Sequence, residues 1–142
     1  MSEDWFVRER LHMAVQDGDF EEVKKLVHEG HDLDAFDDIS KTPLHYGAES
    51  ENIEIARYLL ASGADPNANE EAKIGNTPLG QVAGNCSYEI AHLLIEAGAN
   101  PTIPGWTQLT ALHHASQRKK KEGQRVYDLL LRTAKKKFAD KI

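Results

Sequence analysis

Thr42-Pro43-Leu44-His45 is a phrase that returns twice further along the chain. It recurs as Thr77-Pro78-Leu79-Gly80 and as Thr110-Ala111-Leu112-His113, at intervals of 35 and 33 residues. One interval before the first occurrence stands Leu11-His12, a reduced form of the same phrase. A period of this length indicates stacked units of supersecondary structure, each of which needs its neighbours to bury its apolar face.

The second half of each unit recurs as well. Residues 52–67 and 87–101 share an apolar run that ends in Gly-Ala followed by Asp or Asn. Ile55, Leu59 and Leu60 fall on one face of a helix. A glycine follows these helices at the place where a left-handed C′ residue is expected, namely at Gly30, Gly63 and Gly98.

The recurring phrase also contains the start of a helix. Pro43 and Pro78 fit the first helical turn, where a missing N–H costs nothing. Thr42 and Thr77, which directly precede them, can cap that turn. Each unit is therefore predicted to consist of two short antiparallel helices and a projecting turn.

The phrase resembles that of the ankyrin repeat, and the resemblance covers essentially the whole chain. It implies an all-α ankyrin-repeat solenoid of stacked helix-turn-helix units with projecting β-turn or hairpin loops. These units are expected to form a single domain over residues 1–142, with repeats at residues 5–37, 38–70, 71–105 and 106–142. About three or more such repeats are needed for stability.

Two places depart from the repeat pattern. The longer interval puts two extra residues into the turn near residues 70–73, and repeat four has three extra residues within 117–125. Its last helix is predicted to continue past the usual length, through Lys135-Lys136-Lys137 to Phe138. A polar terminal repeat keeps a solenoid soluble, so this basic helix is interpreted as a cap. Trp5 is interpreted as a cap residue at the other end.

Composition excludes several classes of protein. The chain has no apolar run near 18 residues that would span a membrane. Its first four residues are Met, Ser, Glu and Asp, which do not begin a signal peptide. Cys86 is the only cysteine, so no internal disulfide is expected, and we interpret it as buried and inert. A cytoplasmic protein fits these features.

Histidines and carboxylates are the residues that could carry chemistry. The resemblance implies that His12, His45 and His113 share one position, at which the ring bonds to backbone and braces the turn of the next repeat. Such rings lie about 10 Å apart, too far to share a zinc ion. There is also no phosphate-binding glycine loop and no carboxylate pair on an apolar face. The chain is therefore predicted to be neither an enzyme nor a cofactor or metal binder.

The two halves of the chain carry opposite net charge. Residues 1–71 contain 18 acidic and 6 basic residues, whereas residues 72–142 contain 5 acidic and 11 basic residues. One interpretation is ordinary solvated surface, and the other is that the acidic half attracts a basic partner. The run Arg118–Lys121 could contact nucleic acid, but no aromatic residue is interleaved with it, so a solvated loop is favoured.

Ankyrin-like proteins bind partners through their turn tips and the exposed side of their first helices, which implies candidate residues here. In repeat two these are Phe36, Asp38, Ile39, Lys41, Tyr46 and Glu49. In repeats three and four they are Glu71, Ile74, Asn76, Gln81, Trp106, Leu109, His114 and Gln117. Bulky apolar residues at turn tips, such as Phe36 and Ile39, are typical of binding hot spots, although they could also fold back onto neighbouring turns.

The expected function is to bind another protein. Four capped repeats with nothing appended suggest that binding is itself the activity, as in an inhibitor, an antidote or an immunity protein, and the acidic half suits a basic target. An adaptor that bridges two proteins is one alternative, and a nucleic-acid-associated factor that uses the basic C-terminal region is another. No cofactor, small-molecule substrate or membrane is expected, nucleic acid is the least favoured partner, and the free chain is expected to be a monomer.

Overall fold

A computed structural model describes residues 6–73, 75–105 and 107–141 of the chain. Helices and turns, without any β-strand, make up these residues, as the repeat pattern predicts. The helix pairs are α2 (Arg10–Gln16) with α3 (Phe20–His28), α4 (Pro43–Glu49) with α5 (Ile53–Ala61), α6 (Pro78–Val82) with α7 (Tyr88–Glu96), and α8 (Ala111–Ser116) with α9 (Lys121–Lys137). Two 3₁₀ turns are added at η1 (Glu71–Lys73) and η2 (Ala139–Lys141).

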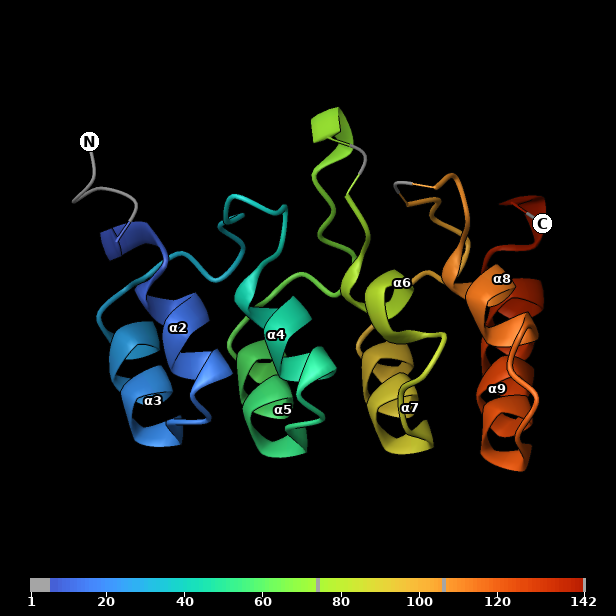
Figure 1. Cartoon of the computed structure of the whole chain (residues 1–142), viewed down its shortest axis with the longest axis horizontal. Helices are drawn as coiled ribbons and strands as arrows, with labels where there is room; N and C mark the ends of the chain where they lie inside the picture. Colours follow the sequence, from blue (N-terminus) through green and yellow to red (C-terminus); the bar gives the residue numbers. More distant parts are fainter. Residues whose placement is uncertain (1–5, 74, 106, 142) are drawn as a thin grey trace.

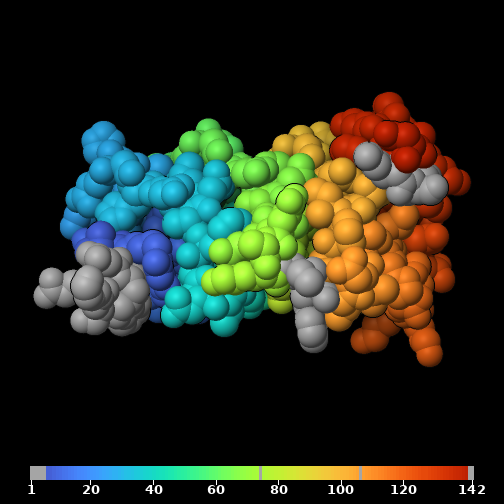
Figure 2. Space-filling model, turned by 90° about the horizontal axis from the view of Figure 1, so that it is seen from above, coloured from blue at the N-terminus to red at the C-terminus, as the bar shows by residue number. Residues whose placement is uncertain are grey.

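The helix pairs stack side by side in the order of the sequence (Figure 1). Among the first helices α2 packs on α4, α4 on α6 and α6 on α8, while α5 packs on α7 and α7 on α9 among the second helices. The turns between repeats project from one long side of the stack, at the top of Figure 1. Seen from that side, the molecule is elongated, with the N-terminal repeats at one extremity and the C-terminal repeats at the other (Figure 2).

Side-chain caps start the helices where the sequence predicts them. The Oγ1 atoms of Thr42, Thr77 and Thr110 accept the N–H of the residue three places on, at 3.5, 2.9 and 3.0 Å. Pro43 and Pro78 occupy the first helical turn. Asn52 and Ser87 cap α5 and α7 in the same way. Each cap satisfies an N–H that the helix itself leaves without a partner.

The second helices of repeats one to three are followed by glycines in the left-handed conformation. Gly30, Gly63 and Gly98 have φ angles of 92°, 109° and 103°, which a side chain would strain. The residue after each glycine donates its N–H to a carbonyl near the end of the helix, which closes the terminus. The C′ prediction is thereby confirmed at all three positions.

The leucine of the recurring phrase forms the core between repeats. Leu11, Leu44 and Leu79 are fully buried and join the isoleucines and leucines of the second helices. Leu112, in the last repeat that the structure describes, is only partly buried. The core is therefore one continuous strip that runs the length of the stack, as expected for a solenoid.

Side chains also bond one repeat to the backbone of the next. His12 Nε2 lies 2.8 Å from Ala35 O and 3.0 Å from Lys41 O, and His45 Nε2 lies 2.6 Å from Asn76 O. In the segments that follow the second helices, Asp34 accepts the N–H of Asp65 at 2.9 Å, and Asn67 accepts that of Asn100 at 2.7 Å. Neighbouring repeats are thus held in register by polar contacts on two sides of the core.

The structure corrects two expectations about repeat four. His113 does not brace a further turn, because its side chain is exposed on α8, the first helix of repeat four. Arg118 does not belong to a solvated loop, because its guanidinium donates to Ala83 O at 3.3 Å. The side chain of Arg118 also lies against Gly123, where an added Cβ would come within 2.6 Å of it. Arg118 is therefore a link between repeats three and four.

Two further sequence expectations concern Cys86 and the last helix. Cys86 is buried, and burial raises the pKa of its thiol to about 11, which keeps it protonated and unreactive. The last helix reaches Lys137, with Ala134 fully buried. Of the helices in the described residues, none is long and apolar enough to cross a membrane.

Candidate partner-binding surface

The turn of repeat two is held closed by a buried carboxylate. Asp37 Oδ1 accepts the N–H groups of Ile39 at 3.1 Å and of Lys41 at 3.0 Å, and the Asp37 N–H donates to Lys41 O at 2.9 Å. The hydroxyl of Tyr46 donates to the other carboxylate oxygen. Ser40 takes a left-handed conformation, with φ 62°, to complete the turn. This turn is therefore rigid before any partner arrives.

The rigid turn displays an apolar side chain at its tip. Ile39 is 64% exposed, the largest exposed fraction among the exposed large apolar residues of the described chain. Beside it, the Asp38 carboxylate is solvated and lies 3.6 Å from an Arg8 guanidinium nitrogen. A solvated pair of this kind contributes little to stability, so Asp38 remains available to a partner.

The first helix of repeat two presents a charged and aromatic cluster beside that tip. Lys41 Nζ lies 2.8 Å from Glu49 Oε2 and 5.3 Å from the centroid of the Tyr46 ring. Burial, together with the hydrogen bond to Asp37, raises the pKa of the Tyr46 phenol, so this group remains a donor. Lys41, Tyr46 and Glu49 thus form one compact polar surface next to Ile39.

The turn of repeat three packs against the turn of repeat two. Glu70 Oε1 accepts the hydroxyl of Ser40 at 2.9 Å, and a Cβ added at Gly75 would lie 3.1 Å from Ser40 Cβ. Glu71, in η1, is exposed. The side chains of Asn76 and Gln81 join through an amide hydrogen bond of 3.1 Å. The two turns therefore make a continuous ridge.

Repeat four contributes Leu109, His114 and Gln117. Leu109 is 36% exposed, His114 is half-buried, and Gln117 is exposed and donates to Ser116 Oγ at 3.2 Å. Three residues singled out in the sequence, Trp5, Ile74 and Trp106, lie outside the described residues. The candidate surface is thus continuous through the described parts of repeats two to four.

Phe36 is half-buried and lines a groove together with Asp34, Asp65 and Ile103. Glu71 of the candidate surface lines the same groove. Ile39, three residues further along the sequence, is instead exposed at the tip of the turn.

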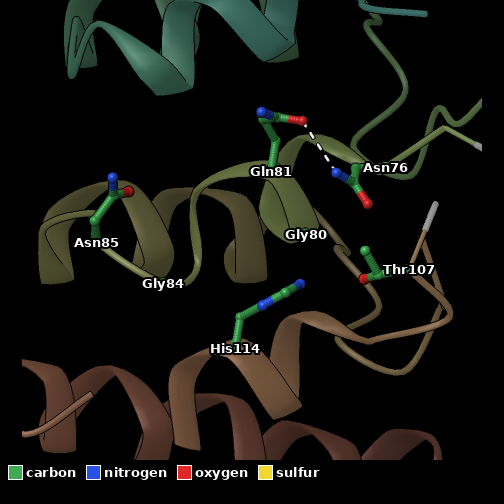
Figure 3. Close-up of a pocket in the computed structure, with 7 residues that line it drawn as sticks. All are labelled: Asn76, Gly80, Gln81, Gly84, Asn85, Thr107 and His114. Carbon is green, nitrogen blue, oxygen red and sulfur yellow. Dashed lines mark hydrogen bonds between the residues drawn. The ribbon is translucent and has the colours of Figure 1, made fainter. Parts of the chain in front are cut away.

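Sequence reasoning missed two features of the surface. Asp37 is a turn anchor rather than a free charge, which its place in an acidic run conceals. A hollow between repeats three and four is lined by Gly80, Gly84 and polar side chains that include Gln81 and His114 (Figure 3). Its signal in the sequence is the glycine that ends the phrase Thr77-Pro78-Leu79-Gly80. Among the residues that the structure describes, no group of three or more His, Cys, Asp or Glu could hold a metal ion.

Comparisons with known proteins agree with this architecture. A family model described as ankyrin repeats (3 copies) matches residues 11–105. Protein phosphatase 1 regulatory subunit 27 from Homo sapiens is 43% identical over 61 residues, which cover 43% of this chain and 40% of that protein. The same subunit from Mus musculus is 45% identical over 58 residues, or 41% of this chain and 38% of that protein.

A further relative is an ion channel. Transient receptor potential cation channel subfamily A member 1 from Homo sapiens is 37% identical over 59 residues, which cover 40% of this chain and 5% of the channel. The chain thus spans about two fifths of the phosphatase subunits and a small part of the channel. Because the family model covers most of its length, the chain belongs to the ankyrin-repeat family, and its repeats indicate a protein-interaction module.

Proposed function

We propose that this chain acts as an inhibitor or antidote-type binder that holds one partner protein on the ridge formed by its turn tips and first helices. The observation that carries the proposal is Ile39, an apolar side chain displayed on a turn that Asp37 has already made rigid. A preorganised apolar anchor surrounded by polar groups is the usual composition of a hot spot, because little conformational entropy is lost on binding.

The charge around this anchor favours a basic partner. Asp38 and Glu71 are exposed acidic residues close to the tips. Asp37 and Glu70 accept hydrogen bonds within the fold and cannot be counted as free charges. Complementary charge raises the rate of encounter more than the affinity.

The relatives support the class of function. Two of them are named as regulatory subunits of protein phosphatase 1, and a regulatory subunit works by binding rather than by catalysis. Protein phosphatase 1 is therefore the first partner to test. The match covers 43% of this chain and 40% of that subunit, so protein phosphatase 1 is one candidate partner.

The Ile39→Ala substitution tests the surface. We expect it to weaken partner binding by about 2 kcal/mol, or about 30-fold, because an anchor loses its buried area. The melting temperature should remain unchanged, since the side chain is exposed in the free protein. Binding is measured by calorimetry against protein phosphatase 1 and against proteins captured from the host by the wild-type chain. Glu54→Gln, on an exposed position of α5, is the control.

The activity of the captured partner distinguishes an inhibitor from an adaptor. Loss of the captured partner's activity on addition of the chain supports an inhibitor, whereas an unchanged activity indicates an adaptor. If Ile39→Ala binds every partner as tightly as the wild type and the Glu54→Gln control do, the ridge is not the binding surface.

A further inference from the structure

Where repeat three meets repeat four, Gly80 occupies the position of the histidines that bond to the next turn in the two preceding repeats, His12 and His45. In repeat two, the His45 ring fills the space beside the next turn and bonds to Asn76 O at 2.6 Å. The same position of repeat three is Gly80. Gly80 has no ring to place there, and it lines an open hollow of about 350 Å³ instead.

A second glycine widens the same hollow. Gly84 occupies the position of Glu49 in repeat two and is exposed just beyond the short helix α6. A Cβ at Gly84 would have only His114 Cβ within 4 Å, at 4.0 Å. The space above Gly84 is therefore open rather than filled by a neighbour.

Polar side chains form the walls. Figure 3 shows Asn76 and Gln81 on one side, His114 of α8 on the opposite side, Thr107 at one end and Asn85 at the other. Asn76 Nδ2 donates to Gln81 Oε1 at 3.1 Å, which fixes the Gln81 amide so that its own NH₂ group is the outer donor. Among the residues that the structure describes, the lining contains no carboxylate and no lysine or arginine.

This lining discriminates between kinds of side chain. A charged group would meet no opposite charge among the described lining residues. A hydrocarbon side chain would cover the outer NH₂ group of Gln81 and offer it no acceptor. A carboxamide satisfies both requirements, because it is neutral and offers a donor and an acceptor to groups of the same kind.

We propose that the hollow between repeats three and four is a recognition pocket for a carboxamide side chain, Asn or Gln, of the bound partner protein. The inference deepens the proposed function and rests on it, because the pocket opens beside the ridge that carries Ile39. It assigns to repeats three and four a specificity that the anchor in repeat two does not supply.

The probe is N-acetyl-glutamine methylamide, titrated into the ¹⁵N-labelled protein and followed by NMR. We expect saturable shifts of the side-chain NH₂ groups of Gln81 and Asn85, with an affinity of about millimolar for so small a ligand. The corresponding arginine, glutamate and leucine derivatives should bind about fivefold more weakly or not at all. Equal shifts with all four probes, or shifts spread over the whole protein, would overturn the pocket.

Two variants test the location of the pocket. Gly84→Leu should fill it and abolish the shifts, while Gln16→Leu, at the same exposed position of repeat one, should leave them intact. Gln81→Glu keeps the shape of the side chain and adds a charge, so preference should move from the glutamine probe to the arginine probe. The Gln81→Glu test does not depend on whether a leucine is tolerated at position 84.

The outcomes are independent of the partner assay. If the probe fails to bind while Ile39→Ala weakens the partner, the pocket is wrong and the ridge stands. If the glutamine probe binds and responds to Gly84→Leu while Ile39→Ala has no effect on the partner, the pocket stands and the anchor is wrong.

Discussion

A single ring, that of His45, joins two repeats by being both buried and neutral. Its Nδ1 accepts the N–H of Thr42 at 3.0 Å, so the proton is on Nε2, which donates to Asn76 O at 2.6 Å. Burial lowers the pKa of His45 from 6.5 to about 4, and the nearby Lys41 ammonium acts in the same direction. Protonation of Nδ1 would remove an acceptor and place a charge in the core.

This lowered pKa predicts a loss of stability in acid. Between pH 6.5 and about 4 the unfolded chain binds a proton at His45 and the folded chain does not. The contribution is therefore fully present above pH 6.5 and decreases as the pH falls, by about 3 kcal/mol in all. Urea unfolding of the wild type and of His45→Gln at pH 7 and pH 4.5 measures it. An equal acid loss in both proteins would show that other groups are responsible.

At the scale of the elements, the last helix closes the C-terminal end of the stack. Thr133 and Ala134 are buried, and the Thr133 hydroxyl donates to Leu129 O at 2.9 Å. Phe138 is half-buried just after the helix, with its N–H donated to Ala134 O at 2.9 Å. The exposed Lys135, Lys136 and Lys137 give this end its polar face.

Truncation after Thr133 should lower the free energy of unfolding by about 2 kcal/mol, because it removes the buried Ala134 and the half-buried Phe138. Truncation after Phe138, which removes only the residues around η2, is the matched control and should cost much less. Chemical denaturation gives both values. Identical midpoints for the two truncated chains would mean that the end of α9 does not contribute to the cap.

The first helix of repeat three has Gly80 at the position where the neighbouring repeats have His45 and His113. A histidine can be introduced there by substitution. Gly80→His should build the missing brace, with its ring donating to Leu109 O, the carbonyl equivalent to Asn76 O. A new Cβ would lie 3.1 Å from Thr77 Oγ1, and repeat two accommodates this crowding with a longer cap bond, 3.5 Å against 2.9 Å.

We expect Gly80→His to raise the free energy of unfolding by about 1 kcal/mol, from one hydrogen bond and the removal of a helical glycine. Thermal unfolding of the variant, with Gly80→Ala as the control for the loss of glycine, measures the effect of the ring alone. A variant no more stable than Gly80→Ala would show that the ring does not reach the turn.

At the scale of the whole molecule, stacking converts the charge pattern of the sequence into a charge separation in space. The repeats follow the long axis in sequence order, so the acidic residues 1–71 and the basic residues 72–142 belong to opposite halves (Figures 1 and 2). Among the acidic residues near the tips, Asp38 and Glu71 are exposed, and the pair that Asp38 forms with Arg8 is solvated.

Association with a basic partner should therefore slow as the salt concentration rises, while dissociation changes less. Replacing Asp38 with Asn and Glu71 with Gln should flatten that dependence, because these charges face the approaching partner. Glu54→Gln combined with Glu89→Gln, on exposed positions of the second helices, is the control and should change it less. Stopped-flow rates at several salt concentrations measure the effect. Equal changes from both double variants would mark the acidic half as ordinary solvated surface.

The amino-acid sequence by itself determined the repeat architecture, because the features involved are local. The caps at Thr42, Thr77 and Thr110 act within three residues, and Gly30, Gly63 and Gly98 act within one turn of helix. The period then places equivalent leucines one above another in the core. The general location of the binding ridge followed from the same spacing, although its role stays a prediction.

Only the tertiary structure decided which side chains are free to meet a partner. Asp37 and Arg118 look like surface charges in the sequence, yet both are held by backbone groups. His113 has the sequence of a brace but is exposed, and Gly80 has no side chain and lines a hollow. These outcomes depend on what packs against each residue, and that is set by a neighbouring repeat about 33 residues away rather than by the adjacent sequence.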